Sequence, residues 1–207
     1  MKRFIVDPDE QIQAEVAHHS QEEKRQTTAK KTPKRREHMQ IIKKYLPNAK
    51  KMLCVGCRDD SEVQDFINFG YKAIGIDLAN NTNLIKRLDA HKIQEKFEQN
   101  QFDVVYTSHS LEHMYDVDTV MRAIRHTTKK GVYIILPEGG ERKGSDPATP
   151  SVNHPSIFDI MNAKCNTVQD VLNNPNLLND FAPFGKIQLM YYKRAKTEIH
   201  ILFKFIE

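Results

Sequence analysis

From Lys51 onward, short hydrophobic runs alternate with longer amphipathic segments. The runs have the length and composition of buried strands, and the segments between them place apolar residues at helical spacing. Three such segments predict helices over residues 61–69, 91–100 and 115–130, the first of them ended by Gly70. Strands that alternate with helices predict a mostly parallel sheet covered on both faces. The five predicted strands are KMLCVG, YKAIGID, NLIKRLDA, FDVVYTS and GVYIILP.

The C-terminal part of the chain follows a different pattern. Two strand-like runs, KIQLMYYKR and TEIHILFKFIE, are separated only by a short polar link around Ala195 and Lys196. So short a link joins antiparallel strands, because a parallel pair needs a long crossover. We therefore predict that the sheet ends in a hairpin.

The N-terminal part is polar and lacks a strong apolar period up to residue 36. The stretch EHMQIIKKYLP then places Met39, Ile42 and Leu46 at helical spacing and stops at Pro47, so it predicts a helix that packs on the edge of the domain. We divide the chain into a basic helical extension, 1–46, and a single domain, 47–207.

Charge is unevenly distributed along the 207 residues. The first 50 residues hold 12 lysines and arginines against seven acids, and KRQTTAKKTPKRR, residues 24–36, holds seven basic residues and no acid. This run has two interpretations, a solvated lead-in or a segment that meets nucleic-acid phosphates.

The remaining composition favours an intracellular protein. No apolar run reaches the length of a membrane span, and the N-terminus lacks the apolar region of a secretory signal. The chain has three cysteines, an odd number that points to a reducing compartment. We expect a cytoplasmic protein without a membrane partner.

The loop after the first strand, CVGCRDDSE, is poor in glycine for a nucleotide site. Ligands of open parallel sheets bind outside the carboxyl ends of the strands, where Gly56 lies. Asp59 and Asp60 would repel a diphosphate, whereas carboxylates cap a helix well and tolerate a cation. The loop therefore favours a nucleoside without phosphates.

Two acids follow at the next strand ends. Asp77 lies 21 residues after Gly56, near the spacing at which a carboxylate accepts hydrogen bonds from ribose hydroxyls. Asp89, with Ala90 beside it, suits the edge of an adenine. Each acid has an alternative interpretation as a helix cap or turn former.

Together, the motifs CVGCRDDSEV, GIDL, LDAHKI, FDVVYTSHSLEHMYDVDTVMRAI and KKGVYIILP resemble those of the class I S-adenosylmethionine-dependent methyltransferases, of the type 11-like group. The resemblance covers residues 52–137. It implies a three-layer α/β/α Rossmann-like fold with seven strands in the order 3-2-1-4-5-7-6, the last strand antiparallel. The sequence departs from the family where Arg58 and Asp60 replace glycines.

The resemblance also implies the cofactor and its site. The cofactor would be S-adenosylmethionine, with S-adenosylhomocysteine as product. Gly56 would approach the methionine moiety, Asp77 the ribose, and Ser108 the sulfonium. The cofactor-binding residues implied in this way are Gly56, Asp77, Leu78, Asp89, Ala90 and Ser108.

The turn SHSLEH supplies two candidate catalytic residues, His109 and His113, because imidazole titrates near neutral pH and can deprotonate an acceptor. The alternative is that His109 only shapes the cofactor pocket and that His113 packs on the following helix. We interpret Glu112 as a residue at the start of a helix and not as a base. His154, in a later loop, is a weaker catalytic candidate than the two histidines of the turn.

Cys54 and Cys57 form a C-x-x-C pair, but Cys54 falls within the first strand and is expected in the core. His18, His19, His38 and Cys165 lack the spacing of a zinc site, so we expect no metal.

The residues leave the methyl acceptor open. The turn after the fourth strand carries no proline, unlike that of DNA amino-methyltransferases, so a small-molecule acceptor fits best. Two alternatives remain, an RNA or nucleic-acid-associated methyltransferase that uses residues 24–36, or a decayed methyltransferase-like module that binds a partner.

Overall fold

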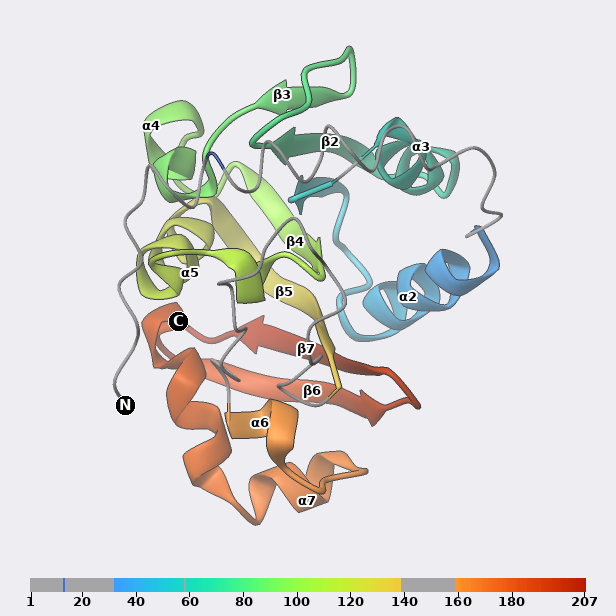
Figure 1. Ribbon diagram of the computed structural model, residues 1–207. Helices are drawn as coiled ribbons and strands as arrows, with labels where there is room; N and C mark the ends of the chain where they lie inside the picture. The colour runs from blue at the N-terminus through green and yellow to red at the C-terminus, as the bar shows by residue number, and fades with distance from the viewer. Residues whose placement is uncertain (1–12, 14–31, 58, 139–158) are drawn as a thin grey trace.

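The computed structural model describes residue 13 and residues 32–57, 59–138 and 159–207. In this part of the chain, seven strands form one sheet, with helices on both of its faces (Figure 1). The strands are β1 (Lys51–Val55), β2 (Lys72–Asp77), β3 (Ile85–Arg87), β4 (Phe102–Ser108), β5 (Thr128–Pro137), β6 (Ile187–Arg194) and β7 (Glu198–Phe205). The helices are α2 (Thr32–Tyr45), α3 (Asp60–Asn68), η1 (Ala90–Lys92), α4 (Ile93–Lys96), η2 (Leu111–His113), α5 (Val117–Thr127), α6 (Asp159–Asn162), α7 (Val168–Leu172) and η3 (Pro175–Phe184).

The strand order is β3-β2-β1-β4-β5-β7-β6, which confirms the fold that the resemblance implied. The first five strands pair in parallel, and β7 pairs antiparallel with both of its neighbours, β5 and β6. Because β7 runs backwards, its first residue, Glu198, pairs with Pro137, the last residue of β5. Glu198 therefore lies at the edge where the parallel strands end.

Two layers of helices enclose the sheet. Helices α2 and α3 cover one face, and α4, α5 and the C-terminal helices cover the other (Figure 1). Met39, Ile42 and Leu46 of the predicted N-terminal helix are buried among residues of β1 and β5, which confirms that this helix packs on the sheet. The domain boundary at residue 46 stays a prediction.

Two helix predictions were too long. The helix expected over 115–130 ends at Thr127, because Thr128 already pairs with Phe102 as the first residue of β5. The helix expected over 91–100 is reduced to η1 and the four residues of α4. There Phe97 turns to extended backbone and packs edge-on against Phe102. In both places, contacts with the sheet override the local helical pattern.

In the part of the chain that the structure describes, every helix is too short or too polar to span a bilayer.

Candidate active site

The turn after β1 is built around Gly56, which has a positive φ of 71°. Its amide donates to the carbonyl oxygen of Ile76 at 2.9 Å. A Cβ at this position would lie 2.3 Å from Oγ of Ser110, so only glycine fits. Next to it, Asp59 accepts a hydrogen bond from the amide of Ser61 at 2.8 Å and caps α3, which confirms the capping that the sequence predicted. Arg58 lies outside the described residues.

Asp77, the last residue of β2, presents one open carboxylate oxygen. The residue is only 4% exposed, and Oδ1 accepts from the amides of Ala79 at 2.8 Å and Asn80 at 2.9 Å. No donor among the described residues reaches Oδ2. This oxygen can therefore accept a hydrogen bond from a ligand hydroxyl without breaking the turn.

Asp89 is engaged at both oxygens. Oδ1 accepts from the amide of His91 at 3.0 Å and lies 2.6 Å from its Nδ1, while Oδ2 accepts from the hydroxyl of Tyr115 at 3.3 Å. Burial alone would raise the pKa of Asp89, but these contacts lower it below its ordinary value. Asp89 caps η1, which confirms the alternative interpretation of this residue as a helix cap. Beside these acids, Leu78 is half-buried and Ala90 is buried.

Strand β4 ends at Ser108, and His109 begins the turn that follows it. His109 has a positive φ of 53°, which is uncommon for a residue with a side chain, and its amide donates to the carbonyl oxygen of Ile135 at 3.0 Å. Oγ of Ser110 reaches the carbonyl oxygens of Ser108 at 3.0 Å and Gly56 at 3.2 Å. These contacts bring the histidine turn against the glycine turn of β1.

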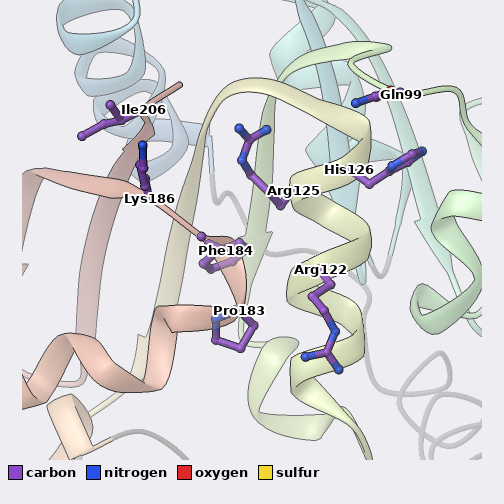
Figure 2. Close-up of a pocket in the computed structure, with 9 residues that line it drawn as sticks. Gln99, Arg122, Arg125, His126, Pro183, Phe184, Lys186 and Ile206 are labelled. Carbon is purple, nitrogen blue, oxygen red and sulfur yellow. The ribbon is translucent and has the colours of Figure 1, made fainter.

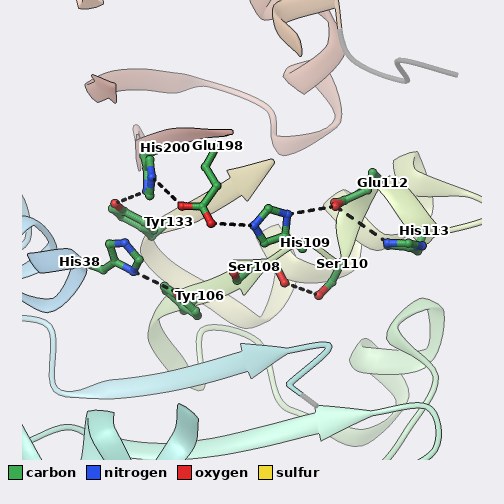
Figure 3. A network of polar contacts seen from close by, with 10 residues as sticks. All are labelled: His38, Tyr106, Ser108, His109, Ser110, Glu112, His113, Tyr133, Glu198 and His200. Carbon is green, nitrogen blue, oxygen red and sulfur yellow. Dashed lines mark hydrogen bonds and ion pairs between the residues drawn. The ribbon is translucent and has the colours of Figure 1, made fainter. Parts of the chain in front are cut away.

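His109 lies between two carboxylates, as Figure 3 shows. Its Nε2 is 3.4 Å from Oε1 of Glu198, and its Nδ1 is 3.7 Å from Oε1 of Glu112. Burial alone would lower the pKa of His109, but Glu112 and Glu198 raise it above the ordinary value. The side chain is 38% exposed, so a ligand can reach it.

His113 is the second histidine of the turn. Its Nε2 lies 4.0 Å from the same oxygen of Glu112, whose side chain is only 3% exposed. The structure therefore joins both predicted histidines through Glu112. Sequence reasoning missed Glu198 altogether, because its only signal is its place at the start of the final, antiparallel strand.

The other sequence candidates do not form a reactive site. Cys54 and Cys57 are free and buried, and burial raises the pKa of both thiols, which confirms that Cys54 belongs to the core. Among the described residues, no three His, Cys, Asp or Glu side chains cluster as metal ligands would. His18, His19 and His154 lie outside the described residues.

A cavity of about 490 Å³ lies at the opposite edge of the sheet (Figure 2). Arg122, Arg125 and His126 of α5 contribute to its lining, together with Lys186, just before β6, and Ile206, just after the antiparallel β7. This cavity contains no predicted site residue.

Comparison with known proteins gives the family. A profile described as a methyltransferase domain matches residues 16–166. No curated protein sequence matches the chain. The chain belongs to the methyltransferase-domain family and is a class I S-adenosylmethionine-dependent methyltransferase.

Solved structures support the same fold. One is Burkholderia thailandensis 1,6-didemethyltoxoflavin-N1-methyltransferase with bound 1,6-didemethyltoxoflavin and S-adenosylhomocysteine. It matches with a TM-score of 0.64 at 9% identity, over 100% of this chain and 94% of that one. The [4+2]-cyclase SpnF matches with a TM-score of 0.53 at 11% identity, over 82% and 79% of the two chains. The N-terminal domain of EvdMO1 with S-adenosylhomocysteine bound matches with a TM-score of 0.51 at 11% identity, over 85% and 81%.

The edge of the sheet at which the parallel strands end, the carboxyl edge, fits this cofactor. Oδ2 of Asp77 is open to a ribose hydroxyl, and the Gly56 turn is flanked by the carboxylates of Asp59 and Asp60, which suit a cationic sulfonium better than a phosphate.

Proposed function

We propose that this methyltransferase methylates a small-molecule acceptor at the carboxyl edge of its sheet. The observation that carries the proposal is the contact between Ser110 and Gly56, 3.2 Å from Oγ to the carbonyl oxygen. It sets a turn that bears two histidines directly against the turn that fits the methyl donor. Donor and acceptor would then meet between β1 and β4, and holding them in line supplies much of the rate acceleration.

The cofactor would be held along the ends of β1, β2 and β4. Gly56 and Ser108 would flank the methionine moiety and the sulfonium, Asp77 would accept from the ribose, and Leu78 with Ala90 would contact the adenine. Asp89 would reach the adenine edge only by sharing an oxygen that His91 or Tyr115 already uses. Asp77 should therefore contribute more to cofactor affinity than Asp89.

When bound, the cofactor supplies an electrophilic methyl carbon whose bond to sulfur breaks as the bond to the acceptor forms, the electron pair leaving with the sulfur. The chain's own residues position the acceptor and take up its proton. His109 and His113 are the candidates for this role, because each has an imidazole that is about a third exposed and a carboxylate as neighbour.

Two observations support a small acceptor over a nucleic acid. The toxoflavin methyltransferase, which shares this fold, acts on a small molecule by its name. In the basic run 24–36, Arg35 forms an ion pair with Asp65 of α3 at 2.8 Å and contacts Ser61, so the domain itself holds this guanidinium. Residues 24–31 lie outside the described residues.

The test uses S-adenosylmethionine labelled in its methyl group. The purified protein is incubated with extract of the source cell, separated beforehand into low-mass, RNA and protein fractions. The proposal expects enzyme-dependent transfer of label to a low-mass compound that chromatography separates from S-adenosylmethionine, and no such compound when the protein is boiled. Label that accumulates in RNA instead, and is lost when residues 1–31 are deleted, would contradict it.

A further inference from the structure

A continuous series of polar contacts runs from β5 through β7 to His109, in the turn after β4 (Figure 3). The hydroxyl of Tyr133 on β5 lies 3.2 Å from Nδ1 of His200 on β7. Nε2 of His200 lies 3.4 Å from Oε2 of Glu198, and Oε1 of Glu198 lies 3.4 Å from Nε2 of His109. Glu198 therefore bridges two imidazoles, one buried and one open to ligand.

The protons in this series can be placed by their chemistry. Burial raises the pKa of Tyr133, which keeps its O–H, and burial lowers the pKa of His200, which keeps this imidazole neutral with a single N–H. If Nδ1 of His200 held that proton, the lone pair on Nε2 would face the carboxylate of Glu198. The favourable arrangement has Tyr133 donating to Nδ1 and the N–H of Nε2 facing the carboxylate of Glu198 at ion-pair distance.

The contacts of His109 likewise favour one position for its proton. The nearer contact, 3.4 Å from Nε2 to Glu198, lies within hydrogen-bond reach, whereas 3.7 Å from Nδ1 to Glu112 does not. Neutral His109 thus donates its proton from Nε2, and Nδ1 keeps the lone pair. In this arrangement Nδ1 is the nitrogen that can accept a proton.

Glu112 is placed to stabilise that proton once it arrives. Its side chain is 3% exposed, and its Oε2 accepts no hydrogen bond from the described residues. A buried carboxylate that lacks hydrogen-bond donors is stabilised when a positive charge forms beside it. The charged or titratable described groups that face His109 are Glu112 from η2 and Glu198 and His200 from β7.

We propose that Glu198 is a positioning residue that holds His109 with Nδ1 as the proton acceptor, and that this lets the site deprotonate a hydroxyl acceptor as it is methylated. The second part rests on the proposed function. In the reaction, Nδ1 takes the hydroxyl proton, the oxygen forms its bond to the methyl carbon, and the sulfur leaves with the electron pair of the broken bond. The products are a methyl ether, a neutral thioether and an imidazolium held between two carboxylates.

The test needs neither cofactor nor acceptor. The imidazole nitrogens of His109 are followed by NMR across a pH titration in the wild type, Glu198→Gln and Glu198→Asp, with His109→Gln used for assignment. Glu98→Gln is the matched control, since Glu98 is an exposed glutamate far from the site. The proposal expects Nε2 to stay protonated throughout, Nδ1 to titrate, and the midpoint to move to lower pH in Glu198→Gln only. Glu198→Asp keeps the charge and should keep most of the raised midpoint.

Two results would overturn the proposal. One is a His109 midpoint that Glu198→Gln leaves unchanged, and the other is a neutral wild-type imidazole protonated on Nδ1. If Glu198→Gln does not fold, the wild-type spectrum still decides the second point. Calorimetric binding of S-adenosylmethionine by the wild type is measured separately, so that loss of the cofactor role is not mistaken for loss of the Glu198 role.

Discussion

The two halves of the carboxyl edge are held together in different ways. In the half formed by β2 and β3, Asp77 and Asp89 bind the backbone amides of residues two or three positions further on. In the half formed by β4, β5 and β7, His109 depends on Glu198, which is 89 residues away. The first half is a set of local turns, and the second is an assembly of distant segments.

This difference separates cofactor binding from acceptor chemistry. A local turn keeps its shape when one side chain changes, so a variant there should lose ligand affinity and little stability. The histidine half connects to the buried His38 of α2, whose ring centre lies 5.0 Å from that of His200. Changes in this half should therefore affect the stability of the whole domain.

The largest loss of stability is expected from a substitution at Gly56, where the turn after β1 contacts the turn after β4. Gly56→Ala places a Cβ 2.3 Å from Oγ of Ser110 at a φ of 71°. Strain and overpacking together should cost about 3 kcal/mol of unfolding free energy. Gly70→Ala is the matched control, because Gly70 also has a positive φ but no atom within 4 Å of the added Cβ, so it should lose about 1 kcal/mol. Urea unfolding compares the two, and equal losses would mean that the turns are not in tight contact.

The next effect is a loss of stability at low pH. Burial and, to a smaller extent, the nearby His200 lower the pKa of His38 to about 4, whereas an unfolded histidine titrates near 6.5. The unfolded state therefore binds the proton first, so the stability is fully present above pH 6.5 and is lost as the pH falls to 4. The loss should approach about 3 kcal/mol.

Urea unfolding at a series of pH values measures this loss. His38→Phe keeps the ring packing against Tyr133 and should flatten the pH dependence between 6.5 and 4, while the exposed His126→Gln should leave it unchanged. A profile as steep in His38→Phe as in the wild type would show that another group is responsible.

A third effect concerns cofactor affinity. Asp77→Asn keeps an oxygen for the amides of Ala79 and Asn80 but replaces Oδ2 with an amide donor. Loss of a charged hydrogen bond to ribose should weaken S-adenosylhomocysteine binding about 10- to 100-fold, with little change in stability. Calorimetry measures the affinity, and an unchanged dissociation constant would remove Asp77 from the site.

The smallest effect is expected at Asp89. Asp89→Asn should weaken S-adenosylhomocysteine binding only a few-fold, because His91 and Tyr115 already occupy the carboxylate. The same calorimetric titration makes the comparison. If Asp89→Asn lost more affinity than Asp77→Asn, the assignment of roles to the two acids would be reversed.

The contrast between the halves also explains what the sequence could predict. Strands, the final hairpin and the cap at Asp59 follow from local patterns, and the strand order followed from the family resemblance. Glu198 could not be identified in this way, because nothing near it in sequence distinguishes it from other strand residues. Its role depends on the pairing of β7 with β5, which places it beside Pro137 and within reach of His109. The lengths of α4 and α5 were mispredicted for the same reason, since contacts with Phe102 and Thr128 decide where they end.

The most direct test of the cofactor site is an NMR map of backbone amides during titration with S-adenosylhomocysteine. We expect the largest shifts at the strand ends, in residues 56–57, 77–79, 89–91 and 108–110. Shifts that gather instead around Arg122, Arg125 and Lys186, in the cavity at the opposite edge, would contradict this expectation.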